Sequence, residues 1–209
     1  MEYSSKPSHG ENSGSIVVHR QDGSSSVNSH TTPSGLLFAT LSLETPSFSE
    51  FFKGLEILTN AVDFTKLPYR RSISYEGRFN WKTMIDGFQE CLHCQYTHPT
   101  FSKFYPPTFY SVTNHSNFSQ HVADPRKPSD GLFLYFFPIC TLNVYGGGMS
   151  SFRTLPSTNP GVSRMEFDYY HSGTDEEFEE SVAYSLPNPY LTSPFFFPIK
   201  AGYPFTNSK

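Results

Sequence analysis

Four strand-like runs separated by turn residues occupy residues 132–171 and set the strongest limit on the fold. They read LFLYFFP, CTLNVYG, MSSFRTLP and SRMEFDYYH. Gly146, Gly147 and Gly148 break the series at one point, and the segment STNPG breaks it at another. Short aromatic and β-branched runs bounded by such turns are typical of strands. The pattern predicts an antiparallel meander.

Further elements are expected on both sides of the meander. Residues 35–43 and 71–79 have strand-like patterns, and residues 45–58 begin a helix, because Ser47 and Glu50 have the spacing of a capping box. The segment 174–184 predicts a helix capped by Thr174. Residues 100–130, rich in Pro, Ser and Asn, predict a long irregular connection of the kind that forms lids or binding loops.

The two ends of the chain differ in composition from its middle. Residues 1–27 are serine-rich and lack periodicity, which predicts disorder. Residues 185–209 contain five prolines and a triple Phe but no Asp or Glu, and we expect this tail to be poorly folded.

Composition excludes several classes of protein. A net charge of −4 offers no basic patch for nucleic acid, and no apolar run approaches the length of a membrane span. The N-terminus has no apolar signal region, and three cysteines do not make a disulfide framework. We therefore expect a reducing, cytoplasmic location. The 17% aromatic content suits a β-rich core or an aromatic-lined pocket.

Chemically active residues gather in NWKTMIDGFQECLHCQYTHPTF, residues 80–101. Asn80 predicts a helix cap, and the helix is expected to run from Trp81 to about Tyr96, because Pro99 forbids its continuation. On this helix three side chains share one face at i, i+4 and i+7: Asp86, Glu90 and His93.

His98 completes a candidate metal pair with His93. A straight helix would turn the two imidazoles apart, but a residue before proline leaves the α region, so that His98 can swing back. Alternatively, His93 and His98 are ordinary polar residues near the end of a helix. Two histidines with a carboxylate would form the facial triad of non-haem Fe(II) oxygenases.

Two other metal sites compete with this interpretation. Zinc could use Cys91 and Cys94 with a histidine, although these side chains point in different directions and Cys140 is the one remaining cysteine. A Rieske cluster needs C-x-H and C-x-x-H pairs, and the chain contains no C-x-x-H.

The segment resembles the iron-binding segment of the catalytic domain of Rieske non-haem iron ring-hydroxylating oxygenase α subunits, nearest to their choline monooxygenase-like branch. Asn80-Trp81-Lys82, the acidic Asp86, Glu90-x-x-His93 and His98 follow the family pattern. Weaker similarity extends over residues 28–184. The resemblance implies an α+β, helix-grip domain in which an antiparallel sheet surrounds a long helix, incomplete here at both ends.

The resemblance also implies a chemistry. His93 and His98 would bind one Fe(II), Glu90 would pass electrons from the [2Fe-2S] Rieske cluster of a neighbouring subunit, and Asp86 would support the ligands. The reaction would be hydroxylation of choline or a related quaternary amine with O₂, as in glycine betaine synthesis. Electrons would come from NAD(P)H through a reductase. The partners would be a reductase and, in a homotrimer or a mixed assembly, an intact α subunit.

Two departures from the family pattern bear on these expectations. Residues 1–27 cannot supply a Rieske domain, and the third iron ligand, an Asp expected after the helix at 174–184, is missing. The acidic residues of that helix are better explained as a solvated face; they are Asp175, Glu176, Glu177, Glu179 and Glu180. A truncated or misread gene would explain both ends. The alternative function is a non-catalytic helix-grip protein that binds a ligand or regulates an intact paralogue.

Overall fold

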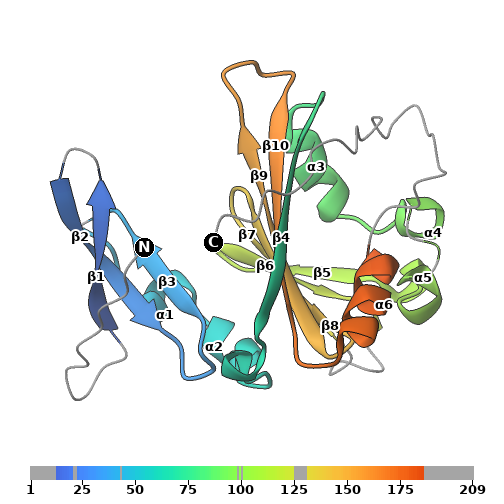
Figure 1. The fold of residues 1–209 in the computed structure, drawn as a ribbon, viewed down its shortest axis with the longest axis horizontal. Helices are drawn as coiled ribbons and strands as arrows, with labels where there is room; N and C mark the ends of the chain where they lie inside the picture. Colours follow the sequence, from blue (N-terminus) through green and yellow to red (C-terminus); the bar gives the residue numbers. More distant parts are fainter. Residues whose placement is uncertain are drawn as a thin grey trace. The chain divides into compact units, whose positions relative to one another are not determined.

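Residues 13–20, 23–42, 44–97, 99, 101–124 and 131–185 are described by the computed structural model of the protein (Figure 1). They divide into two compact units, the first made of Met1–Pro68 with Asn114–Ser119 and the second of Tyr69–Thr113 with Gln120–Lys209. The whole candidate ligand segment, residues 80–101, therefore belongs to the second unit.

The first unit contains a three-stranded antiparallel sheet in the order β1-β2-β3. Its strands are β1 (Ser13–Arg20), β2 (Gly23–Thr31) and β3 (Leu37–Thr40). β1 and the start of β2 lie in the segment expected to be disordered, of which residues 1–12 and 21–22 fall outside the described residues. This segment is rich in serine, but it also contains Ile16, a β-branched residue of the kind that favours strands. Ile16 pairs with Val27 in the sheet.

The predicted capping box at Ser47 and Glu50 is confirmed, but the helix that it starts is short. Two helices, α1 (Phe48–Phe51) and α2 (Leu55–Thr59), replace one. They are separated at Gly54, whose φ of +88° is incompatible with a continuous right-handed helix. A 3₁₀ helix, η1 (Phe64–Lys66), follows.

The second unit holds most of a seven-stranded sheet in the order β4-β10-β9-β8-β7-β6-β5. Its strands are β4 (Tyr69–Gly77), β5 (Ser111–Asn114), β6 (Phe118–Val122), β7 (Leu132–Phe136), β8 (Cys140–Tyr145), β9 (Gly148–Pro156) and β10 (Ser163–His171). The run from β7 to β10 pairs antiparallel, strand by strand, and β4 joins β10. The predicted meander is confirmed.

The connection expected to be irregular at 100–130 is instead largely structured where it is described. It holds α5 (Phe101–Phe104), a 3₁₀ helix η2 (Pro107–Phe109), β5 and β6. Residues 100 and 125–130 lie outside the described residues. The sequence of β6, FSQHV, is mostly polar, so its pattern did not predict a buried strand. In the structure three of its five side chains are buried, those of Phe118, Ser119 and His121.

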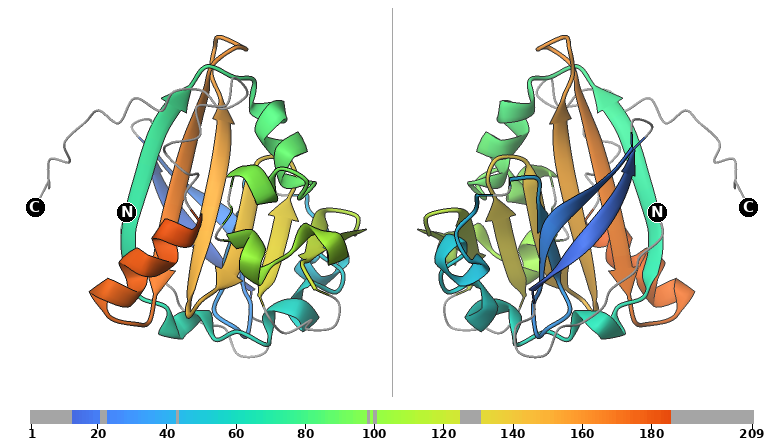
Figure 2. Two further views of the ribbon diagram at one scale, coloured as in Figure 1. Left: turned by 90° about the vertical axis from the view of Figure 1, so that its right-hand side faces the viewer. Right: turned by 90° about the vertical axis from the view of Figure 1, so that its left-hand side faces the viewer.

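All helices of the second unit that the structure describes lie on one face of its sheet (Figures 1 and 2). They are α3 (Trp81–Phe88), α4 (Cys94–Thr97), α5 and α6 (Asp175–Ser185). Helices packed on one face of an antiparallel sheet make an α+β fold, and the predicted fold class is confirmed. The longest of these helices, α6, has eleven residues.

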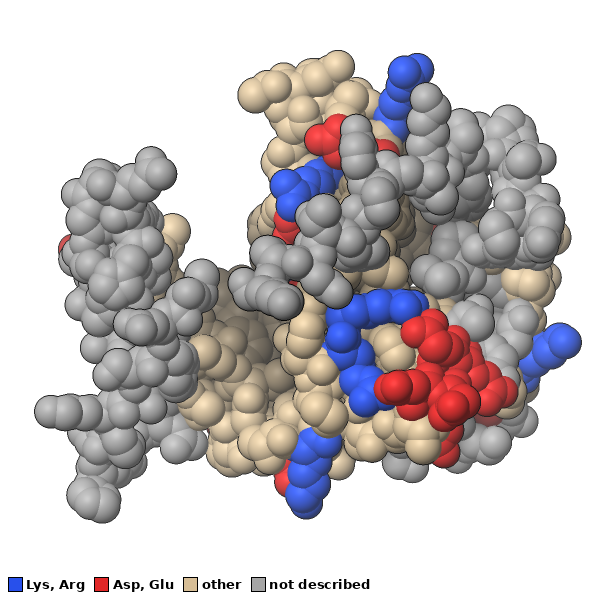
Figure 3. All heavy atoms as spheres, in the orientation of Figure 1, with Lys and Arg blue, Asp and Glu red and all other residues tan. Residues whose placement is uncertain are grey.

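α6 is held to the sheet by both apolar and charged contacts. Phe178 and Val182 pack with Tyr169 of β10 in a buried cluster. On the outside, Asp175 accepts a hydrogen bond from Arg70 at 2.6 Å, and Glu179 accepts one from Arg71 at 2.8 Å. The arginines lie against the acidic residues of α6 in Figure 3. These two carboxylates are therefore occupied in a surface network.

Candidate functional site

Helix α3 begins as its sequence predicts and ends earlier than expected. The Asn80 side chain accepts a hydrogen bond from the Lys82 backbone N–H at 3.0 Å, and this interaction caps the first turn. The prediction of one helix through Tyr96 is wrong, because α3 stops at Phe88 and α4 starts at Cys94.

Glu90 interrupts the helix. Its carboxylate accepts hydrogen bonds from the backbone N–H groups of Leu92 and, at 3.4 Å, of His93. These donors would otherwise bond to carbonyls one turn earlier, so the side chain competes directly with the helical pattern. The resulting turn between α3 and α4 carries the candidate ligand residues on a short connection.

Glu90 and His93 are brought into direct contact by this turn. The carboxylate Oε1 of Glu90 is hydrogen-bonded to Nδ1 of His93, and the two side chains are 38% and 28% exposed. The Nε2 atom of His93 lies 3.9 Å from Cys94 Sγ. A carboxylate on one ring nitrogen fixes the tautomer and orientation of a histidine that binds metal through the other nitrogen.

Asp86 and His98 are the other predicted site residues. Asp86 is exposed on α3, and its charge adds to burial in raising the pKa of Tyr135. His98 lies outside the described residues. Within the part of the chain that the structure describes, no three His, Cys, Asp or Glu side chains gather closely enough to hold a metal ion.

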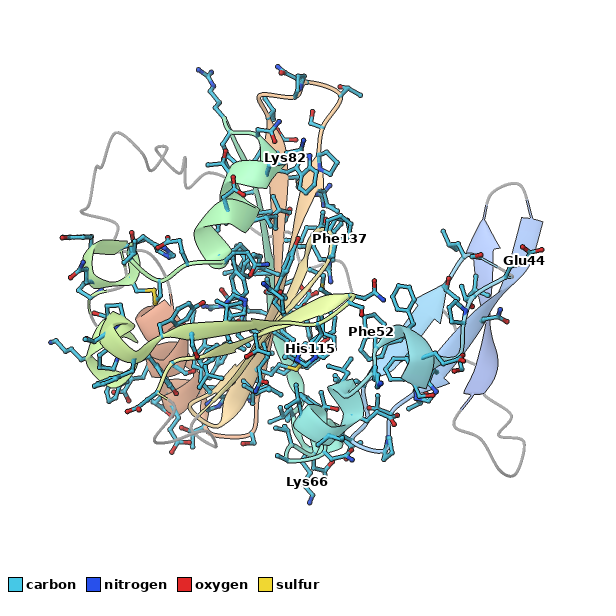
Figure 4. The ribbon with its side chains drawn as sticks, turned by 180° about the vertical axis from the view of Figure 1, so that it is seen from behind. Glu44, Phe52, Lys66, Lys82, His115 and Phe137 are labelled. Atoms are coloured by element: carbon cyan, nitrogen blue, oxygen red, sulfur yellow. A yellow bond between two sulfur atoms is a disulfide. The ribbon has the colours of Figure 1, made fainter. Side chains whose placement is uncertain are left out.

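Cys91 and Cys94 are joined by a disulfide, which the sequence pattern did not predict. Their Cα atoms are 5.2 Å apart and both residues are buried; the bond appears in yellow in Figure 4. The two cysteines stand three residues apart on a single turn, in which the Cys94 backbone N–H donates a hydrogen bond to the Cys91 carbonyl oxygen at 3.1 Å. Oxidised cysteines offer no thiolate, so this state provides no zinc ligands.

The disulfide predicts a simple thiol count. In denatured, unreduced protein we expect one reactive thiol, that of Cys140, and after reduction all three cysteines should react. Alkylation followed by intact-mass measurement gives both numbers. Three reactive thiols without prior reduction would show that Cys91 and Cys94 are separate.

Tyr110 and His121 form a second polar pair next to this turn. The Tyr110 hydroxyl is hydrogen-bonded to His121 Nδ1 and lies 3.5 Å from the Phe88 carbonyl oxygen. His121 is 3% exposed, and its ring centroid lies 4.8 Å from that of Phe88. The pair was missed because both residues fall in the segment expected to be irregular.

Burial controls the protonation of both members of this pair. It lowers the pKa of His121 to about 4 and raises the pKa of Tyr110, to which the nearby charge of Glu90 contributes. Both groups are therefore neutral at pH 7. The influence of Glu90 on Tyr110 links the pair electrostatically to the Glu90–His93 turn.

A fall in stability on acidification follows from the lowered pKa of His121. Between about pH 6.5 and about pH 4 the unfolded chain binds a proton on this imidazole and the folded protein does not, so acidification favours unfolding. Urea unfolding of the wild type and of His121→Gln at about pH 7 and about pH 4.5 measures this effect. The wild type should lose more stability than the variant; equal losses would contradict the burial of a neutral histidine.

Two comparisons with known proteins bear on this site. Residues 64–127 match the protein-family model described as "Ring hydroxylating alpha subunit (catalytic domain)". The matched range is less than a third of the chain and includes Glu90, His93 and His98. No curated protein sequence matches the chain.

Solved structures of the quaternary ammonium Rieske monooxygenase CntA share the fold. An inhibitor complex is similar with a TM-score of 0.63 at 18% identity, over 83% of this chain and 49% of that one. A complex with the substrate L-carnitine gives a TM-score of 0.61 at 15% identity, over 93% and 61% of the two chains. A further structure, of a quaternary ammonium Rieske monooxygenase, gives a TM-score of 0.63 at 15% identity, over 93% and 62% of the two chains.

At these identities the similarity establishes the fold of a Rieske oxygenase catalytic domain. The chain spans about half to three-fifths of the length of the CntA chains that it matches. Among the helices that the structure describes, none is long and apolar enough to cross a membrane.

Proposed function

We propose that this chain is an iron-binding catalytic domain of the Rieske-type ring-hydroxylating oxygenases. The observation that carries the proposal is the contact between Glu90 and His93, inside the segment that matches the family model. The similarity of the fold to CntA supports it.

The metal residues of the proposed site are His93 and His98, with Glu90 and Asp86 as supporting residues. The His93–Glu90 pair fits Fe(II), since an imidazole oriented by a carboxylate is a suitable ligand for this ion. Iron held there would supply the activation of dioxygen. Glu90 holds the proton on Nδ1 of His93 and so directs the metal-binding lone pair to Nε2.

The proposed substrate is a small quaternary amine, choline or a related compound, which is hydroxylated with O₂. One CntA structure contains the substrate L-carnitine and another the substrate γ-butyrobetaine. In this chain aromatic rings gather around Phe88, with the Phe152 and Tyr135 ring centroids at 5.5 Å and 6.2 Å. Such rings attract a trimethylammonium group through cation–π contacts.

Electrons would reach the proposed site from outside the described part of the chain. One structure of a quaternary ammonium Rieske monooxygenase is described as giving insights into inter-subunit electron transfer. By analogy, Glu90 would connect the site to a [2Fe-2S] Rieske cluster of a neighbouring subunit, reduced by NAD(P)H through a reductase. The neighbour would be a further copy in a trimer or an intact α subunit.

A second candidate function is that of a non-catalytic ligand-binding or regulatory protein with the same fold. It is favoured by one observation, that the described residues bring together no set of three metal-binding side chains. Such a protein would bind a quaternary amine without oxidising it.

Hydrogen peroxide separates the two candidates, because it replaces dioxygen together with two electrons and two protons. The oxidation of choline to the hydrated aldehyde with peroxide releases one water and needs no reductase. We expect the chain loaded with Fe(II) to form betaine aldehyde, detected by mass spectrometry, well above the level formed by His93→Ala. Equal amounts in the two proteins would contradict the oxygenase and favour ligand binding.

A further inference from the structure

A buried nitrogen of His121 lacks a hydrogen-bond partner. The residue is 3% exposed, and among the described residues no group is hydrogen-bonded to its Nε2 atom. Leaving a buried polar atom unpaired destabilises a folded protein, and nearly all such atoms in native structures are paired. A ligand that forms a hydrogen bond with this nitrogen would explain why no described group of the protein is paired with it.

The partner of the other ring nitrogen decides what Nε2 can do. The Tyr110 hydroxyl has one proton, and its contact with His121 Nδ1 is closer than its 3.5 Å distance to the Phe88 carbonyl oxygen. If Nδ1 carried the imidazole proton, the hydroxyl proton would have only the Phe88 carbonyl oxygen at 3.5 Å, beyond the usual length of an O–H···O hydrogen bond, so we assign the hydroxyl as donor to the neutral Nδ1. The imidazole proton then resides on Nε2, which makes this atom a hydrogen-bond donor.

The surroundings of this donor are aromatic. The rings of His121 and Phe88 lie 4.8 Å apart, and the rings of Phe152 and Tyr135 flank that of Phe88. A buried water needs two to four polar partners, which rings do not provide. A ligand that combines one acceptor oxygen with a cationic, apolar group satisfies both the donor and the rings.

The pair is also close to the proposed iron residues. Tyr110 lies beside the last residue of α3, Phe88, and the charge of Glu90 acts on its hydroxyl. His121 is thus linked through one hydrogen bond to a residue within electrostatic reach of the Glu90–His93 turn.

We propose that His121 Nε2–H donates a hydrogen bond to an oxygen atom of a quaternary ammonium substrate and so selects substrates that carry such an oxygen. This inference rests on the proposed function, because it concerns the substrate of the same site. Tyr110 is the positioning residue that fixes the tautomer of His121.

Two probes of equal size test the selection. Choline and propyltrimethylammonium have the same head group, and a methyl group in the second replaces the hydroxyl of the first. Calorimetric titration of the protein should show that choline binds about fivefold to tenfold more tightly, the effect of one neutral hydrogen bond. Equal dissociation constants, or no binding of either probe, would overturn the inference.

Two variants separate the ring nitrogens. His121→Asn keeps an amide near the position of Nδ1 but has no atom at that of Nε2, whereas His121→Gln places an amide N–H₂ near Nε2. The preference for choline should vanish in the first and persist in the second, with circular dichroism confirming that both are folded. A preference that is unchanged in His121→Asn would overturn the inference.

Nitrogen NMR of histidine-labelled protein provides a readout that does not depend on any substrate. We expect the His121 proton on Nε2 in the wild type and a redistribution toward Nδ1 in Tyr110→Phe. A proton on Nδ1 in the wild type would overturn the donor assignment. The iron content of the protein tests the proposed function separately, so a protein that binds iron without selecting choline refutes only this inference.

Discussion

Replacement of His93 by alanine is expected to remove nearly all specific iron binding. The imidazole is held by the Glu90 carboxylate in the geometry used by metal-binding histidines. Loss of a ligand should exceed the effect of losing an outer-shell partner, so the affinity for Fe(II) should fall by more than about 100-fold. Anaerobic Fe(II) titration measures the change, and His98→Ala should behave in the same way.

His30 provides a matched control for this experiment. Its Nε2 atom lies 2.9 Å from Glu56 Oε1, with side chains 20% and 35% exposed, so it forms a similar histidine–carboxylate pair. It lies outside the segment matched by the family model. His30→Ala should retain iron at the wild-type affinity; equal losses in His30→Ala and His93→Ala would contradict the assignment.

Glu90→Gln should have two distinct effects. The amide cannot hold the Nδ1 proton of His93 as a carboxylate does, so the affinity for Fe(II) should fall by about 10-fold to 100-fold. At saturating iron, oxidation of choline with peroxide should continue, because peroxide brings its own electrons. Turnover that depends on an intact α subunit, a reductase and NADH should be lost.

The comparison of the two assays identifies the role of Glu90. Glu56→Gln, which alters the matched pair at His30, is the control and should leave both assays unchanged. If Glu90→Gln retains the reductase-dependent turnover, Glu90 does not transmit electrons. If both assays fail at saturating iron, Glu90 is required for the site itself.

Much of the fold could be predicted because its signals are local. The four runs from Leu132 to His171 are rich in aromatic and β-branched residues and end at turn residues, and the Ser47 capping box depends on a spacing of three residues. The end of α3 could not be predicted in this way. It depends on side-chain bonds of Glu90 to the backbone and on the Cys91–Cys94 bond, and neither alters the hydrophobic pattern.

The candidate site likewise combines a contact that residue spacing predicts with one that it does not. Glu90 and His93 are three residues apart, so their contact follows from spacing even though the expected helix does not form. Tyr110 and His121 meet through the pairing of neighbouring strands in a segment that appears irregular. The role of His121 becomes visible only with its burial and its unpaired nitrogen.

The metal content of the purified chain tests the central claim most directly. After anaerobic incubation with Fe(II) and removal of unbound metal, mass spectrometry of the elements should find about one iron per chain, as a mononuclear site requires. His93→Ala should contain almost none. Zinc in place of iron, or no bound metal in the wild type, would contradict the assignment of residues 80–99 as an iron site.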